Sequence, residues 1–142
     1  MVKVLPHVMR NINEFNIPAG DTHAYEILYF GVNLILMFDY RLSFDIQVIN
    51  NSDSSNEIEI IIISRKDVPV WKKGNSNTDI KFYYSNSEQR INDVFKPSVS
   101  DAYAFILNNK TPLVGNNSNK TVEVTLIHTW QQEIKESQLK DI

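Results

Sequence analysis

The side chains best suited to acid–base chemistry or metal binding near neutral pH are three histidines, His7, His23 and His128. No two of them stand at the spacing that puts ligands on one helix face, and the chain has no cysteine to complete a zinc site. His128 shares the register of the apolar residues around it, which is typical of a histidine held in a core. We therefore expect no metal site and no catalytic histidine.

Other catalytic patterns are equally weak. The sequence has no G-x-S-x-G motif for a nucleophile and no glycine-rich phosphate loop. Asp39 and Asp45 share one face of an expected strand, but that face is the polar one that water normally covers. The acidic stretch around Asp53, Glu57 and Glu59 lacks an ordered calcium-ligand spacing. We expect a protein that is not an enzyme and needs no cofactor.

Aromatic residues beside basic ones are better candidates for binding. Trp71 is followed by Lys72 and Lys73, and the run Phe-Tyr-Tyr occupies residues 82–84. Rings next to cations can stack on bases or sugars. Because strand side chains alternate between faces, either residues 82 and 84 or Tyr83 alone should point outward. We place Trp71, Lys72, Lys73 and Tyr83 on a candidate binding surface.

A long polar loop is the second candidate surface. Residues 108–119 are rich in asparagine and lie between two apolar, strand-like runs, residues 101–107 and 120–130. Loops of this kind connect strands and are common contact surfaces. The candidate contact residues in it are Asn108, Asn109, Asn116 and Asn117.

Composition limits the class of protein. A chain of 142 residues with 42% hydrophobic residues fits one globular domain, residues 1–142. A net charge of −3 argues against binding to a nucleic acid backbone. No apolar run is long enough for a membrane helix, and the first residues do not resemble a secretory signal. With no cysteine in the chain, we expect a cytoplasmic protein, with a virion as the alternative location.

The dominant sequence period is two, the period of a β-strand. From residue 34 to residue 48 every even position is apolar or aromatic, and a bend is expected near residues 39–41 because the run is long for one strand. Further strands are expected at residues 24–30, 57–64, 79–84, 90–95, 101–107 and 120–130. Residues 72–78 and 85–88 read as loops.

Short strands at regular spacing predict an all-β fold, an antiparallel β-sandwich of about eight strands. After residue 130 the sequence becomes polar. We expect residues 131–142 to form a polar C-terminal tail or a short helix.

Four segments taken in order resemble the GOLD (Golgi dynamics) domain, a β-sandwich. They are IPAGDTHAYEILYFGVNLILMFDY, FDIQVI, DAYAFILNN and KTVEVTL, and they span roughly residues 17–128. Asp101 stands where the family often has a glycine, and the cysteine pair of some members is missing. The resemblance implies a module that binds proteins, in some cases lipids, through loops or an edge strand, without catalytic residues.

Three functions remain open at this stage. The first is a noncatalytic adaptor that recognises a protein partner through a sheet edge or through residues 71–77 and 108–119. The second is a carbohydrate- or lipid-binding sandwich that uses Trp71, Tyr83 and Tyr84. The third is a self-assembling viral or structural protein. The oligomeric state does not follow from the sequence.

Overall fold

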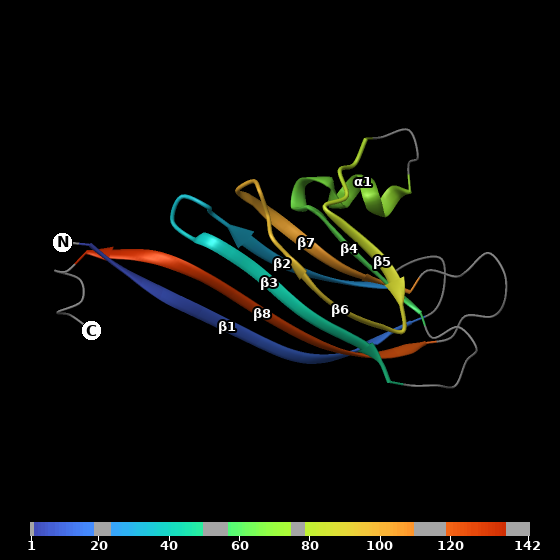
Figure 1. Cartoon of the computed structure of the whole chain (residues 1–142). Helices are drawn as coiled ribbons and strands as arrows, with labels where there is room; N and C mark the ends of the chain where they lie inside the picture. Colours follow the sequence, from blue (N-terminus) through green and yellow to red (C-terminus); the bar gives the residue numbers. More distant parts are fainter. Residues whose placement is uncertain (1, 19–23, 50–56, 75–78, 110–118, 136–142) are drawn as a thin grey trace.

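A computed structural model describes residues 2–18, 24–49, 57–74, 79–109 and 119–135, which form a β-sandwich with a short helix on one outer face (Figure 1). The expected all-β antiparallel sandwich is confirmed. The elements in chain order are β1 (Val2–Ile17), β2 (Tyr25–Val32), β3 (Phe38–Val48), β4 (Ile58–Ser64), the 3₁₀ turn η1 (Arg65–Asp67), α1 (Val68–Lys73), β5 (Tyr84–Glu88), β6 (Arg90–Phe95), β7 (Asp101–Asn108) and β8 (Lys120–Lys135).

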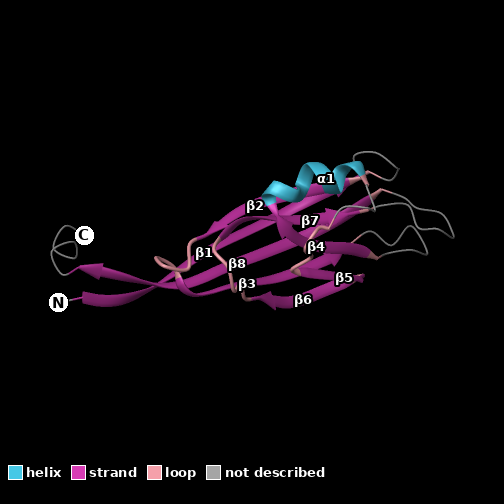
Figure 2. Cartoon of the chain, turned by 90° about the horizontal axis from the view of Figure 1, so that it is seen from above, coloured by secondary structure: helices cyan, strands magenta, loops and turns pink. Residues whose placement is uncertain are grey.

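The two sheets have four strands each. The first sheet has the order β1-β8-β3-β6, and the second has the order β2-β7-β4-β5. On one side of the sandwich β5 and β6 are linked through Gln89, which accepts a backbone hydrogen bond from Val48. On the other side lie the edge strands β1 and β2. The paired strands β1 and β8 run well beyond the other strands toward the chain ends (Figure 2).

The main core lies between the sheets. The even residues of β3 and β8 point inward from the first sheet and meet the inward residues of β4 and β7. Phe44 packs edge-on against Phe105 with 5.2 Å between ring centroids, which interlocks the layers near their centre. Each fully buried aliphatic side chain contributes about 1.5–3 kcal/mol of transfer free energy. The period-two pattern read from β3 therefore predicts its buried face correctly.

The outer face of the second sheet carries a second apolar cluster. Ile61, Ile63, Ala104 and Ile106 are buried there under Val68 of α1. Strands β4 and β7 are thus covered on both faces, which is why their sequences are nearly continuous apolar runs instead of alternating ones.

Helix α1 covers this cluster. Of the loop expected at residues 72–78, Lys72 and Lys73 belong to the helix instead, and residues 75–78 lie outside the described part of the chain. The local signals are a proline in the first turn, two lysines in the last turn, and Gly74 with φ of 66° at the C-cap. A left-handed residue is needed there to end the helix, and glycine takes that conformation without strain. The helix is short, and what holds it in place is the apolar surface beneath it.

Strand β1 was absent from the sequence-based expectation. Its side chains that lie on the same face as the core include Asn11 and Asn13, which stand opposite Leu126 and Val124 of β8. Its opposite face carries apolar residues, Val8 and Ile12 among them. A strand with polar residues toward the core side does not show the usual amphipathic pattern.

The expected bend in β3 is present. Phe38 pairs with Gln131 and Arg41 with Thr129, so Asp39 and Tyr40 together stand opposite one residue of β8. Asp39 has φ of 56°, a left-handed conformation that aspartate tolerates better than most residues. This bulge turns Tyr40 into the interior, where it is buried.

Three boundaries differ from the expectation. The run expected to be strand from residue 34 is a turn at residues 34–37, and β3 begins only at Phe38. Residues 79–83 are not a strand, and β5 instead begins at Tyr84 and continues through residues that were expected to be a loop. Residues 131–135, the start of the expected polar tail, continue β8 as strand, because they pair with residues 2–6 of β1. Residues 136–142 lie outside the described part of the chain.

Asn109 ties together strand ends from both sheets. Its amide Nδ2 donates to the carbonyl oxygens of Ile17 at 3.1 Å and Pro18 at 3.2 Å. Its backbone N–H donates to the carbonyl of Ala24 at 2.7 Å, and its Oδ1 accepts from the Nζ of Lys120. Because these groups flank the ends of β1, β2, β7 and β8, this residue fixes the register at one end of the sandwich.

Replacing Asn109 with alanine should lower the free energy of unfolding by about 2–3 kcal/mol, since buried polar groups lose their partners. Urea denaturation at neutral pH measures this. Asn92→Ala, at an exposed position on β6, is the matched control and should change stability by less than about 0.5 kcal/mol. Equal stability of the two variants would contradict the role given to Asn109.

Candidate functional site: a cleft between the edge strands β1 and β2

The helical candidates Trp71 and Lys72 meet around one tyrosine. Trp71 packs edge-on against Tyr25 with centroids 5.2 Å apart, and the Lys72 ammonium lies 5.7 Å from the same ring centroid. Asn108 is the cross-strand partner of Tyr25, so it lies on the same outer face of the second sheet. Its amide donates to Glu59 at 2.8 Å. Lys73, the last residue of α1, is exposed.

Tyr83 belongs to a different surface. Its ring packs edge-on against Tyr103 at 5.3 Å, and the Lys81 ammonium lies 4.9 Å from its centroid. Tyr84 is also partly buried, against Phe44 at 5.1 Å, and its hydroxyl donates to Asp93 at 3.0 Å. The expected alternation of residues 82–84 is wrong, because the chain is not a strand before Tyr84.

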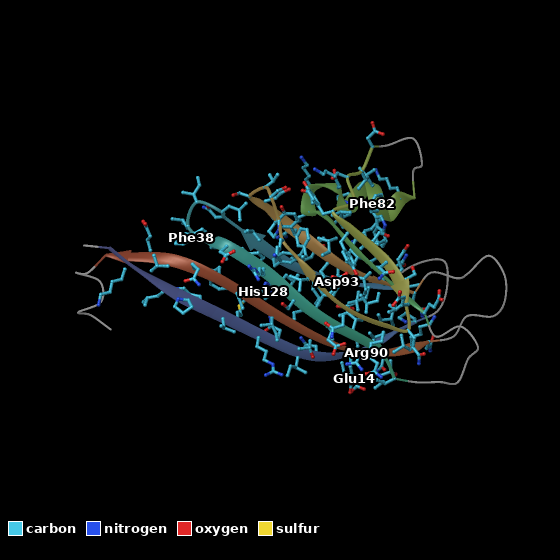
Figure 3. The ribbon with its side chains drawn as sticks, in the orientation of Figure 1. Glu14, Phe38, Phe82, Arg90, Asp93 and His128 are labelled. Carbon is cyan, nitrogen blue, oxygen red and sulfur yellow. The ribbon has the colours of Figure 1, made fainter. Side chains whose placement is uncertain are left out.

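Phe82 is the exposed member of this aromatic run, with 51% of its surface open (Figure 3). Trp71 and Tyr83 pack against clusters on opposite faces of the second sheet, so the structure does not bring them into one site.

The loop candidates divide as well. Asn109 is 1% exposed, and its amide is engaged with the strand ends described above, so its side chain does not reach the surface. Asn116 and Asn117 lie outside the described residues.

A cleft lies between the edge strands β1 and β2, with a volume of about 440 Å³. That size is within the range of small-molecule sites in proteins. Residues 27–31 of β2 form one wall, and Met9, Asn11 and Asn13 of β1 form the other. The floor comes from β3 and β8 of the first sheet.

Aromatic rings line and support the floor. Phe30 of β2 stacks on Tyr103 at 5.4 Å and meets the His128 ring edge-on at 5.5 Å. Tyr40 stacks on Trp130 at 6.3 Å. Farther along β1, His7 lies flat on Trp130 with centroids 5.4 Å apart. These contacts run from the main core to the extended end of β1 and β8, and they fix the orientation of the rings.

The polar centre of the cleft is the pair formed by Tyr40 of β3 and His128 of β8. His128 is 3% exposed (Figure 3). The Tyr40 hydroxyl is hydrogen-bonded to Nδ1 of His128. A phenol is a stronger proton donor than a neutral imidazole N–H, and an imidazole nitrogen is the better acceptor. We therefore assign the proton of this bond to Tyr40, which places the ring proton of His128 on Nε2.

Burial keeps both groups uncharged. Desolvation lowers the pKa of His128 below its ordinary value, and it raises the pKa of Tyr40, with a smaller contribution from Tyr103. Among the described residues that line the cleft there is no aspartate, glutamate, lysine or arginine. The pair can therefore donate and accept hydrogen bonds in an apolar site that has no formal charge at neutral pH.

The described residues contain no group of three or more histidine or acidic side chains that could hold a metal ion. None of the helices in that part of the chain is long and apolar enough to cross a membrane. The histidine of the cleft is bonded to a tyrosine and not to a serine, threonine or cysteine nucleophile. The arrangement is suited to binding.

Sequence reasoning placed His128 in the inward register, which the structure confirms, but it did not find the cleft. Tyr40 and His128 are 88 residues apart, and the walls come from strands in different sheets. The available signal was the pair of asparagines at positions 11 and 13, on either side of the apolar Ile12.

No family model matches the chain, and no curated protein matches it. A solved chain described as turnip yellow mosaic virus is similar over 92% of this chain and 84% of its own length, with 8% sequence identity and a TM-score of 0.32. A likeness of that degree carries no conclusion about function.

Stability should fall as the pH is lowered from 7.5 to 5.5. The pKa of His128 is lower in the folded state, so the unfolded chain takes up a proton first as the pH drops through about 6.5. Proton uptake by one such group lowers the free energy of unfolding by at most about 1.4 kcal/mol for each unit by which the pH falls. Urea denaturation across this range should show a shallower decline for His128→Gln. An unchanged decline would contradict this account of His128.

Proposed function

We propose that this protein is a noncatalytic interaction module of GOLD-like type that binds another protein at the free edge of β1. The partner segment would add to the first sheet as a further strand. The observation that carries the proposal is an exposed apolar row beside that edge. The four-segment resemblance to the GOLD domain and the sandwich architecture support the same reading.

The edge itself is long. Strand β1 has 16 residues and is the end strand of its sheet, paired along its length with β8 alone in the described part of the chain. An unpaired edge presents a row of backbone N–H and C=O groups to which an extended peptide can hydrogen-bond. Natural proteins usually prevent such edges from pairing with other chains by placing proline or charged residues on them. In β1 these residues are Pro6 and a few charged side chains.

The apolar row supplies side-chain contacts next to the edge. Val8 is 68% exposed and Ile12 is 64% exposed. Arg10 lies between them and pairs with Ile127 of β8, so Ile127 stands on the same outer face. We call Val8, Ile12 and Ile127 the outer apolar row. Ile127 is an apolar residue on the otherwise polar face of β8. Its position beside Val8 and Ile12 of β1 explains why it is apolar.

We propose the cytoplasm as the place of action, because a chain without cysteine suits a reducing compartment. Binding to nucleic acid is not part of the proposal, given the net charge of −3.

The double variant Val8→Lys/Ile12→Lys should weaken partner binding at least tenfold, because it places two charges in the apolar row. Its control is Gln47→Lys/Asn92→Lys, on the outer faces of β3 and β6, where Gln47 stands opposite Glu123 and Asn92 opposite Asp45 and neither pairs with a member of the row. Tagged versions of all three proteins are used for capture from the native host lysate with quantitative mass spectrometry. The partner is the protein retained by the wild type and the control but lost by the β1 variant.

Light scattering on the same proteins separates two kinds of partner. A wild-type dimer that becomes a monomer in the β1 variant would identify a second copy as the occupant of the edge, and would favour the self-assembly alternative. A partner that binds all three proteins equally would contradict the proposal.

A further inference from the structure

The cleft between β1 and β2 has a consistent chemical character. Its walls and floor are mainly apolar and aromatic, with Met9, Leu126 and Trp130 on the side of the first sheet. Its polar groups are neutral: the amides of Asn11 and Asn13 on β1, and the Tyr40–His128 pair at the floor. Sites of this composition bury the apolar body of a ligand and orient it with a few hydrogen bonds.

We propose that this cleft binds an uncharged, mainly apolar molecule with an oxygen acceptor, such as a neutral lipid ester or a long-chain alcohol. The site is separate from the outer apolar row, which lies on the opposite face of β1. The proposal therefore goes beyond protein binding at the strand edge and does not depend on it.

His128 is the group that would orient the ligand. It is almost entirely buried, it lines the cleft, and its hydrogen bond to Tyr40 uses Nδ1. Nε2 has no hydrogen-bond partner among the described residues, yet it is not among the buried polar atoms that are sealed from solvent. A polar atom in such a position needs a partner, and an ester carbonyl or a hydroxyl oxygen fits the donor assigned to Nε2.

The polar residues on the inner face of β1 help to keep the cleft between β1 and β2 open. Asn11 and Asn13 stand opposite Leu126 and Val124, positions where apolar residues would pack onto the core and could draw β1 toward β2. Polar amides at these positions are exposed, which leaves part of Leu126 and its neighbours as cleft lining. A strand selected for stability alone would carry apolar residues there.

The absence of charged residues in the lining sets the specificity. Transfer of a carboxylate or phosphate out of water is costly unless an opposite charge or several donors receive it. The described lining offers neither a lysine nor an arginine. A neutral ester should bind, and the carboxylate of the same chain length should be rejected.

The experiment uses Trp130 as the reporter. The full chain has two tryptophans, so Trp71→Phe leaves Trp130 as the sole source of tryptophan emission. Trp71 lies on the outer face of the second sheet, away from the cleft. Methyl octanoate and octanoate are titrated at pH 7.5, and circular dichroism verifies the fold of each variant.

We expect Trp130 emission to saturate with methyl octanoate, with an apparent affinity at least tenfold higher than that for octanoate. In the same background, Asn11→Phe should fill the cleft and weaken ester binding at least tenfold. Arg10→Phe is the matched control, because it adds the same ring one residue away on the outer face of β1, and it should leave ester binding unchanged. His128→Phe should reduce the preference for methyl octanoate over octane, which has no oxygen.

Three results would overturn the proposal. The first is unchanged Trp130 emission up to the solubility limit of the ester. The second is equal or tighter binding of octanoate. The third is equal loss of binding in Asn11→Phe and Arg10→Phe, which would indicate a general effect of the added ring. Since Asn11→Phe leaves the outer apolar row intact, partner capture by this variant separates failure of the cleft proposal from failure of the edge proposal.

Discussion

The pairing of β4 with β7 is the interaction on which the rest of this structure depends. Both strands are apolar on both faces, so each face must be covered. The inner face is covered by β3 and β8 of the first sheet, and the outer face by α1. Burial of these two faces fixes the order of the layers, and it places the densest packing over β3, β4, β7 and β8.

The edge strands β1 and β2 then lie away from this dense region. Strand β1 continues far beyond the second sheet with β8, where none of the described strands or helices lies opposite it (Figure 2). Between β1 and β2 its inner face lines the cleft at Met9, Asn11 and Asn13, and it joins the main core at Phe15 and Ile17. In the described part of the chain its outer face and edge remain uncovered. The bulge at Asp39 brings Tyr40 to the floor of that cleft, next to His128. One packing constraint thus accounts for both surfaces to which we assign binding.

The sequence predicts the interior of this fold better than its edges. The alternation in β3 and the isoleucine run of β4 identify buried strands because every inward position is filled by an apolar side chain. The same reasoning fails for β1, because the polar residues Asn11 and Asn13 occupy inward positions, opposite Leu126 and Val124. It fails for α1 because six residues are too few to show a helical period, and the helix is held by a sheet face that is assembled from distant segments.

The candidate binding residues were also predicted only in part. Tyr25 brings together Trp71, Lys72 and Asn108. The sequence shows that Trp71 and Lys72 are neighbours, but it does not show that Asn108 lies beside them. Asn109 was grouped with its neighbour in a contact loop, but alternation along the chain turns it inward to the strand ends. The asparagines at positions 11 and 13 mark one wall of the cleft, but its location could not be predicted from the sequence, because its walls belong to two sheets and its polar pair spans 88 residues.

The binding that we assign to the cleft depends on a neutral His128 at its floor, with the ring proton on Nε2. The ¹⁵N spectrum of the imidazole ring at pH 7 tests this most directly, since the two nitrogens have different shifts when protonated and unprotonated. We expect a neutral ring with a protonated Nε2 and with Nδ1 accepting from the Tyr40 hydroxyl. A proton on Nδ1, or a doubly protonated ring at this pH, would contradict it.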